Sequence, residues 1–427
     1  MLKLLAAFIL LFPALIFAQY KNIKINTIEN RPNEVTIVIN PKHPNNIVAA
    51  ANLNNYYYSF DEGQTWINKT IVSDSFGVWG DPVVIFDLNG SVYFFHLSRP
   101  SKEQWIDRIV CQKSTDGGMS WENPGTYTGL NPPKKQDKEW AIADWTNSKW
   151  KNNIYVTWTQ FDKYGSRDPD DKSNIMFSFS SDAGTTWSEA KLINEVSGDC
   201  IDSANTTEGA VPCVGPNGEI YVSWSGPAGI VFDLSLDGGL SWLENDIPVS
   251  PQIGGWEYEI EDIFRCNGMP VTCCDISSSP YNGTIYINFS DARNGDDDID
   301  IFLVKSTDKG NTWSAPKRIN DDPFGNKRQQ FMNWMHVDPL TGVINIIFYD
   351  RRNYDDFHTD VYLARSTNGG ETFTNIKISE EPFKPIKNIF FGDYIGVNSF
   401  NDFVACSWQR LEGGFLSILY CGIDFKK

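Results

Sequence analysis

Short runs that alternate apolar and polar residues follow one another along the chain, without the 3.6-residue apolar period of amphipathic helices between them. Two stretches each contain four such runs, at 140–145, 154–160, 175–180 and 186–193, and at 270–276, 284–290, 299–305 and 312–319. Short alternating runs of this kind are typical of half-buried β-strands. The pattern therefore predicts an all-β protein built from groups of four short strands.

A short motif lies between the third and fourth run of each group. Its pattern is Ser-x-Asp-x-Gly-x-Thr/Ser-Trp, and its Asp or Asn position recurs at intervals of about 55 to 71 residues. The six copies lie at 59–66, 114–121, 180–187, 235–242, 306–313 and, in a weaker form with Asn368 and Phe373, 366–373. Four antiparallel strands repeated at such a period are typical of a β-propeller with four-stranded blades.

The residue types of the motif are those of a hairpin turn. Asp and Asn accept hydrogen bonds from nearby backbone N–H groups, and Gly adopts positive φ at low cost. The hydroxyl residue closes the loop, and the Trp is expected to bury its ring between neighbouring sheets. A carboxylate repeated in this way is therefore interpreted as structural and not catalytic.

Six motifs indicate six blades, but the chain ends favour a seventh. Three more strand-like runs, at 393–399, 403–409 and 415–423, follow the last motif without a copy of their own, and a lone run at 22–27 precedes the first group. The N-terminal run would complete a seventh blade and remove an open sheet edge. We therefore expect seven blades, with six as the alternative. No Gly/Ser linker interrupts 19–427, which is expected to form one domain.

The N-terminus has the pattern of an export signal. Lys3 precedes an apolar run at 4–17, and Ala18 ends it before a polar segment. A membrane anchor is the alternative, but the run is shorter than the roughly 20 residues of a spanning helix. We expect cleavage after residue 18 and a soluble, secreted product, periplasmic or extracellular, with no membrane span.

Eight cysteines would then lie in an oxidising compartment, where disulfides persist. We expect structural disulfides and not a metal site, because no His lies at ligand spacing from a Cys pair. The candidate pairs are Cys200 with Cys213, Cys266 with Cys273 or Cys274, and Cys406 with Cys421. Their connectivity does not follow from spacing.

The charge balance restricts the ligand. Acidic residues outnumber basic ones by 54 to 36, for a formal net charge of −18. Nucleic-acid affinity comes largely from Lys and Arg, so a nucleic-acid partner is excluded as the main one. An anionic ligand would need a local basic pocket within this negative field.

The repeated motif resembles the Asp box of sialidase-like (BNR-repeat) propellers, and the chain is similar to exported bacterial proteins of that family. The short segments 137–140, 349–352 and 392–394 show the same resemblance. It implies a glycan or polysaccharide partner and a glycoside hydrolase of the exo-sialidase kind, with an Arg triad, a Tyr paired with Glu, and an Asp acid/base. The family's Arg-Ile-Pro motif is absent, and Arg31-Pro32 is the nearest match. Relatives also cleave other polysaccharides, by hydrolysis or by β-elimination.

One face of the predicted propeller carries the long connections, at 122–139, 194–209, 249–270 and 379–392, whereas the turns of the opposite face are short. Functional loops gather on one side of a rigid scaffold, so the site is expected there. The catalytic candidates are Asp81, Glu139, Glu208, Tyr349 and Asp393. The substrate-binding candidates are Lys138, Arg265, Arg293, Arg351 and Arg352. Carboxylates there could act as acid and base, and guanidinium groups suit anionic sugars. The structural alternatives are strand capping and Arg–Asp pairs between blades.

An acidic run at 296–300 supplies a second hypothesis. Asp296, Asp298 and Asp300 offer hard oxygen ligands suited to Ca²⁺, although a solvated acidic turn is the alternative. No cofactor is otherwise required. The leading interpretation is a secreted glycoside hydrolase whose site lies at the central mouth. The alternatives are a non-catalytic glycan- or protein-binding propeller and a polysaccharide lyase; the oligomeric state stays open.

Overall fold

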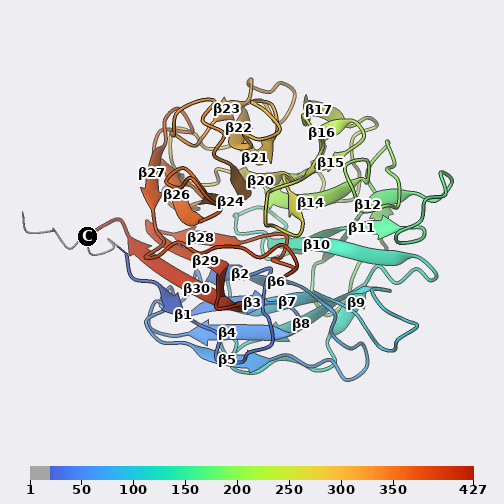
Figure 1. Ribbon diagram of the computed structural model, residues 1–427. Helices are drawn as coiled ribbons and strands as arrows, with labels where there is room; N and C mark the ends of the chain where they lie inside the picture. Colours follow the sequence, from blue (N-terminus) through green and yellow to red (C-terminus); the bar gives the residue numbers. More distant parts are fainter. Residues whose placement is uncertain (1–19) are drawn as a thin grey trace, which may run out of the picture.

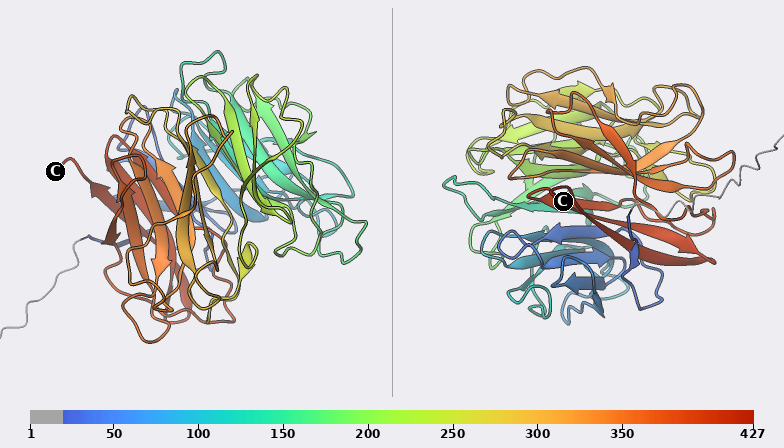
Figure 2. Two further views of the ribbon diagram at one scale, coloured as in Figure 1. Left: turned by 90° about the horizontal axis from the view of Figure 1, so that it is seen from above. Right: turned by 90° about the vertical axis from the view of Figure 1, so that its left-hand side faces the viewer.

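A computed structural model describes residues 20–427, and within that range it contains strands and no helix. Seven four-stranded antiparallel sheets stand around a common centre, and a two-stranded sheet is added to one connection. Figure 1 shows the first strand of each blade nearest the centre, and Figure 2 shows the ring from two other sides. The all-β prediction and the seven-bladed count are confirmed, and the six-bladed alternative is wrong.

Each of the first six blades takes four consecutive strands, from the centre outward. Blade 1 contains β2 Thr36–Ile39, β3 Ile47–Ala51, β4 Asn55–Ser59 and β5 Ile67–Thr70, and blade 2 contains β6 Gly80–Phe86, β7 Val92–Leu97, β8 Ile109–Ser114 and β9 Thr126–Thr128. Blade 3 contains β10 Lys135–Ala143, β11 Ile154–Phe161, β12 Ser173–Ser180 and β13 Lys191–Leu192, and blade 4 contains β14 Glu208–Val214, β15 Ile220–Gly226, β16 Gly229–Ser235 and β17 Ile247–Ser250. Blade 5 contains β20 Val271–Cys274, β21 Ile285–Asp291, β22 Asp300–Ser306 and β23 Lys317–Arg318, and blade 6 contains β24 Gln330–Val337, β25 Ile344–Asp350, β26 Asp360–Ser366 and β27 Thr374–Lys377. The small sheet pairs β18 Glu257–Tyr258 with β19 Cys266–Asn267.

The seventh blade joins the two ends of the chain. It contains β28 Gly396–Phe400, β29 Phe403–Glu412 and β30 Phe415–Asp424, and its outermost strand is β1 Ile23–Lys24. β1 runs antiparallel to β30, with Ile23 opposite Tyr420. The N-terminal strand therefore covers the edge that the last blade would otherwise expose, as the sequence predicts.

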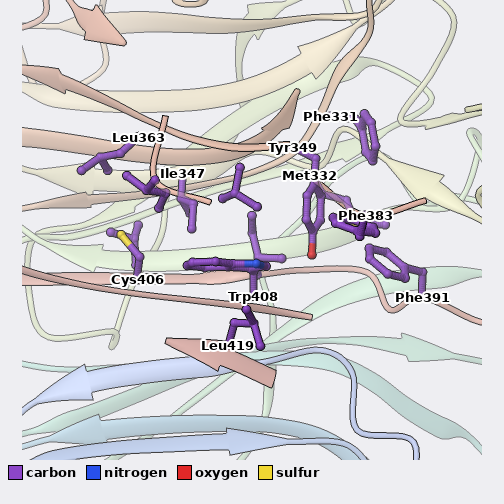
Figure 3. Close-up of a cluster of buried hydrophobic side chains, with 14 of the residues drawn as sticks. Phe331, Met332, Ile347, Tyr349, Leu363, Phe383, Phe391, Cys406, Trp408 and Leu419 are labelled. Atoms are coloured by element: carbon purple, nitrogen blue, oxygen red, sulfur yellow. The ribbon is translucent and has the colours of Figure 1, made fainter. Parts of the chain in front are cut away.

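The core lies between the blades and not within one of them. One buried cluster between blades 6 and 7 contains Phe331, Tyr349 and Trp408, whose side chains pack together in Figure 3. The middle strands of each blade are almost wholly buried because both of their faces pack on neighbouring blades. This packing makes the ring a rigid support for its loops.

The repeated turns have the structural role that the sequence predicts. In the first, Asp61 accepts hydrogen bonds from the Thr65 backbone N–H (2.9 Å), the Thr65 hydroxyl (2.6 Å) and the Ser59 hydroxyl (2.7 Å). The Trp66 ring packs edge-on against Tyr420 of the preceding blade, 5.0 Å between centroids. These turns use the residues that could have extended the fourth strands, so β13 and β23 are shorter than predicted.

Replacing Gly310 in the fifth repeated turn is expected to destabilise the fold by about 1–3 kcal/mol. Its φ is +87°, and a Cβ there would overlap the ring of Phe232, which is fully buried. Denaturant unfolding of Gly310→Ala measures the cost. Gly283→Ala is the matched control, because its φ is +83° but a Cβ would meet only Pro216 at 3.8 Å. If the two variants lose the same stability, the packing of the turn against blade 4 contributes nothing.

The cysteines differ from the prediction, because all eight are unbonded in the structure. Cys406 and Cys421 do oppose each other in the register of β29 and β30. Cys266 and Cys273 lie in β19 and β20, which pair with different strands, and the expected disulfide pairs are not formed. The thiols are mostly buried among apolar side chains and serve as small core residues.

The predicted export signal, with Lys3, the run at 4–17 and Ala18, lies outside the described residues. Within residues 20–427, no helix is long and apolar enough to cross a membrane.

Candidate active site

The innermost strands enter the ring through a repeated distortion. Four of them contain a β-bulge near their start, between Gly80 and Val83, Asp137 and Trp140, Glu208 and Val211, and Phe331 and Trp334. At each bulge one residue has positive φ: Asp81 (+53°), Lys138 (+52°), Gly209 (+76°) and Met332 (+50°). For a residue other than Gly this conformation costs about 1–3 kcal/mol and is concentrated at functional sites. Bulges re-aim side chains, and here Asp81 and Lys138 are directed to the central mouth.

A cavity of about 410 Å³ opens at this mouth. Its walls come from the starts of the innermost strands, from the second-to-third loops and from the blade-to-blade connections, which is the face that the sequence favours. The lining includes Arg31, Glu34, Asn52, Trp79, Asp81, Trp105, Asp137, Lys138, Tyr164, Asp202, Glu208, Arg265, Phe390 and Asp393.

Three aromatic rings fill the centre of the ring below the cavity. Trp140, Trp334 and Tyr394 come from blades 3, 6 and the connection to blade 7, and their centroids lie 4.2 Å (Trp140–Trp334), 5.5 Å (Trp140–Tyr394) and 5.9 Å (Trp334–Tyr394) apart. The space on their other side is lined mainly by apolar residues of the innermost strands. The polar cavity therefore has a closed floor and is open to one face of the propeller.

Arg265 organises one side of the cavity. Its Nε donates to Asp393 Oδ1 at 3.0 Å, its Nη2 donates to Asp393 Oδ2, and its Nη1 donates to Asp202 Oδ2 at 3.0 Å. Asn267 Nδ2 also donates to the Asp393 carbonyl at 3.0 Å. Burial acts to raise the pKa of Asp393, but Arg265 outweighs it and holds that pKa below its usual value. Asp393 is therefore an ionised carboxylate at neutral pH.

The pKa values of four other carboxyl groups of the cavity are shifted in the opposite direction. Burial, reduced in effect by Lys138, raises the pKa of Asp81 to about 6. Burial and the neighbouring Asp202 and Asp137 raise the pKa of Glu208 well above its usual value. The same combination of burial and nearby carboxylates raises the pKa values of Glu34 and Asp137. The cavity thus holds one carboxylate stabilised as an anion beside several carboxyls whose pKa values are raised.

Hydrogen bonds divide these carboxyls into two groups. Asp137 accepts from the Lys138 backbone N–H at 2.9 Å, and Glu34 accepts from the Asp393 backbone N–H at 3.2 Å and from Asn52 Nδ2. Glu208, by contrast, is only 4% exposed, and among the described residues its Oε2 has no hydrogen-bond partner. A buried oxygen that lines a polar cavity without a partner is available to a ligand.

Of the ten catalytic and binding candidates, the cavity brings together five: Asp81, Glu208, Asp393, Lys138 and Arg265. Glu139 lies directly behind them, 2% exposed, and both of its carboxyl oxygens lack a partner among the described residues. Burial, and to a smaller extent the charge of Asp81, raise the pKa of Glu139 well above its usual value. These six residues form one electrostatic unit.

Tyr349 does not belong to this unit. Its ring is buried in the cluster of Figure 3, and its hydroxyl donates to the Gln409 carbonyl at 2.6 Å. It points into the core because it is an interior residue of β25, between blades 6 and 7. The structure therefore places Tyr349 outside the candidate site.

The remaining arginine candidates also lie elsewhere and hold loops. Arg293 pairs with Asp291 and lies over the Phe302 ring, and Arg352 pairs with Asp350 in the same position of the next blade. Arg351 is buried and donates to the Glu261 carbonyl at 2.8 Å. Arg293 and Arg352 therefore pair with aspartates of their own blades, whereas the structural alternative expected such pairs between blades.

The acidic run is likewise tied to its own blade. Asp300 pairs with Arg318 (Nε–Oδ1 2.7 Å), and Asp298 accepts from the Lys327 backbone N–H at 2.9 Å. Asp296 is exposed on the loop. Within the part of the chain that the structure describes, no group of three His, Cys, Asp or Glu side chains is arranged to hold a metal ion.

Several cavity residues were not among the sequence candidates. Glu34 precedes the first innermost strand as Asp81 precedes the core of the second, so the same positional argument would have found it. Asp202 and Tyr164 come from connections whose course the sequence does not define, and the Tyr164 hydroxyl donates to Asp202 at 2.8 Å. Arg31 lies on the cavity rim, exposed, next to Pro32.

Comparisons with known proteins support the fold. No protein-family model matches the chain, nor does any curated protein. Among solved structures, a protein of unknown function from Dyadobacter fermentans is 12% identical, with a TM-score of 0.51 over 95% of this chain and 98% of that one. Penicillium chrysogenum α-L-arabinanase is 13% identical (TM-score 0.50; 95% and 98%), and Hadza microbial sialidase Hz136 is 14% identical (TM-score 0.50; 89% and 73%). At these identities the likeness shows the propeller fold alone.

Proposed function

We propose that this protein is a glycoside hydrolase that cleaves an extracellular glycan in the central cavity. The observation that carries the proposal is the separation of carboxyl pKa values within one site. Asp393 is held ionised by Arg265, whereas Asp81 and Glu208 are shifted toward the protonated form. Carboxyls whose surroundings push their pKa values apart are the usual basis for acid and base roles in glycoside cleavage.

The geometry suggests a role for each group. Glu208, whose Oε2 is uncommitted, donates a proton to the oxygen of the leaving sugar. The Asp393 carboxylate stabilises the positive charge that develops at the anomeric carbon. Asp81, in its ionised form, takes up a proton from an attacking water. Side chains supply every proton transfer in this scheme, so we expect no loss of activity after treatment with a chelator.

The closed floor suggests how the glycan enters. Because Trp140, Trp334 and Tyr394 fill the centre of the ring, a chain cannot pass through it. A cavity open on one side accommodates the end of a chain, which favours release of terminal sugars.

A screen of released sugar from diverse polysaccharides tests the hydrolase proposal. Product without an unsaturated ring supports hydrolysis, an unsaturated product indicates a lyase, and affinity without product indicates a binding protein.

Activity is expected to rise as the pH rises through about 6. The proposed proton uptake needs Asp81 in its ionised form, and its pKa is about 6, so kcat/KM should fall as the pH drops below about 6. Asp393 has a lowered pKa and stays ionised well below that pH. A pH profile of kcat/KM on the best substrate measures this. A profile that is flat from pH 5 to 8 would contradict the assignment of Asp81.

A further inference from the structure

The cavity is unusually rich in carboxyl groups for a site that would bind an acidic sugar. Its lining contains six carboxyl groups and three cationic groups: Glu34, Asp81, Asp137, Asp202, Glu208 and Asp393, against Arg31, Lys138 and Arg265. Glu139 adds a seventh carboxyl directly behind the wall. Burial, and after it the charges of neighbouring carboxylates, raise the pKa values of Glu34, Asp137 and Glu208. A substrate carboxylate or sulfate would add to the repulsion from these carboxylates.

The guanidinium group of Arg265 is not available to a substrate. Arg265 uses Nε, Nη1 and Nη2 in its bonds to Asp393 and Asp202, so its fork already holds carboxylates of the protein. A substrate carboxylate could engage it only by displacing one of these partners and leaving that carboxylate unpaired.

The second internal cation has a similar commitment. The Lys138 ammonium lies 4.1 Å from the centroid of the Tyr394 ring and 5.9 Å from that of Trp140, above the aromatic floor. Its charge also offsets part of the rise in the pKa values of Asp81 and Glu34 that burial causes. Lys138 therefore neutralises the carboxyl cluster, and Arg31 is left as the third cation, exposed at the rim.

The cavity lining also contains aromatic side chains, in contrast to its charged groups. Trp79 and Trp105 lie edge to face at 6.1 Å, and Trp105 continues to Tyr164 at 5.6 Å. Across the mouth, Phe390 lines the cavity and packs against Phe264, which is 60% exposed. Apolar and aromatic walls with a few convergent polar groups are typical of pockets for an uncharged ring.

We propose that the cavity selects an uncharged sugar, stacked on the Trp79–Trp105 wall, and rejects sugars that carry a carboxylate or sulfate. This inference rests on the proposed function for its site. Protonated carboxyls both donate and accept hydrogen bonds, which matches the hydroxyl groups of a neutral sugar. An anionic sugar would instead place its charge beside the Asp393 carboxylate, whose cation Arg265 is already engaged, and specificity would come from that repulsion as well as from the stacking.

Hydrolysis of matched aryl glycosides tests the selection. The same fluorogenic leaving group is attached to neutral pentoses and hexoses and to sialic and uronic acids. We expect kcat/KM for the best neutral sugar to exceed that for every acidic sugar by at least about 100-fold. Equal or faster cleavage of an acidic sugar overturns the selection while leaving the hydrolase function intact.

Binding to the Glu208→Gln variant separates the inference from the proposed function. Calorimetry with neutral and acidic oligosaccharides is expected to show affinity for the neutral set alone. If neutral glycans bind but none is hydrolysed by the unaltered protein, the hydrolase function fails and the selection stands. Tighter binding of acidic glycans, abolished by Arg31→Gln, would assign the rim arginine to a substrate carboxylate and overturn the selection. Absence of all glycan binding overturns both.

The stacking wall has its own variants. Trp79→Ala and Trp105→Ala are expected to weaken binding of the neutral glycan by at least about tenfold. Phe415→Ala is the matched control, because Phe415 is 61% exposed on β30, outside the cavity lining. Unchanged affinity in both tryptophan variants, with folding confirmed by circular dichroism, would contradict the stacking.

Discussion

Glu208→Gln is expected to lower kcat on the best substrate by about 10²–10⁴-fold, the usual contribution of a positioned acid or base. Glutamine keeps the size of the side chain and its ability to hydrogen-bond, but it cannot donate the proton that the leaving sugar needs. The carboxyl is nearly fully buried, and its Oε2 has no partner among the described residues. Removal of the acid group therefore breaks no hydrogen bond of that oxygen within the protein.

The stability of Glu208→Gln is not expected to fall together with its kcat. Burial and the neighbouring Asp202 and Asp137 raise the pKa of Glu208, so its ionisation in the folded state opposes folding. The amide cannot ionise, and the variant should be as stable as the parent at pH 7 or slightly more stable. A loss of kcat accompanied by a lower midpoint of unfolding would indicate a structural role.

Glu244→Gln is the matched control, because Glu244 is exposed beyond the fourth repeated turn, away from the cavity lining. Its kcat should equal that of the parent. Asp81→Asn is expected to reduce kcat and to remove the decline of activity below about pH 6. Full activity in both Glu208→Gln and Asp81→Asn would place the chemistry elsewhere.

The fold was accessible from the sequence because its signals are local and repeated. The polar residues of each turn form hydrogen bonds with one another within a few residues, as Ser59, Asp61 and Thr65 do. The spacing of these residues in the sequence is therefore enough to identify a turn. The seventh blade followed from counting strands that lack a turn and from the need to cover an edge. The pairing of β1 with β30 satisfies that need.

The site was accessible only in part because its geometry depends on backbone distortions. Asp81 and Lys138 could be placed at the mouth from their position before an innermost strand, but the bulges that direct them leave no simple period in the sequence. Asp202 and Tyr164 arrive on long connections, where no pattern fixes the course. Tyr349 does not line the cavity because both faces of β25 pack on neighbouring blades, and alternation with Phe348 and Asp350 does not distinguish such a strand from one with an open face.

Arg265→Met is expected to destabilise the fold by about 3 kcal/mol at pH 7. The substitution keeps an unbranched apolar stem but leaves Asp393 and Asp202, whose side chains are 10% and 16% exposed, without their shared cation. Breaking one partner of a buried ion pair costs more than the pair itself contributes, because the remaining charges stay desolvated. Arg265→Lys should recover only part of the loss, since one ammonium cannot bond both carboxylates as the planar fork does.

The pH dependence distinguishes this explanation from a loss of packing. Arg265 lowers the pKa of Asp393 below its unfolded value, so the pair stabilises the protein above that value and the contribution disappears as the pH falls through the folded pKa. The stability difference between parent and Arg265→Met should therefore be largest near neutral pH and shrink below about pH 4. Urea unfolding at several pH values measures this stability difference.

Arg328→Met, which breaks an ion pair with the fully exposed Asp355, serves as the control and should cost at most about 1 kcal/mol. A difference for Arg265→Met that is constant from pH 3 to 8 would mean that the guanidinium acts through packing, and Asp393 would then lose its assignment as the ionised carboxylate of the site.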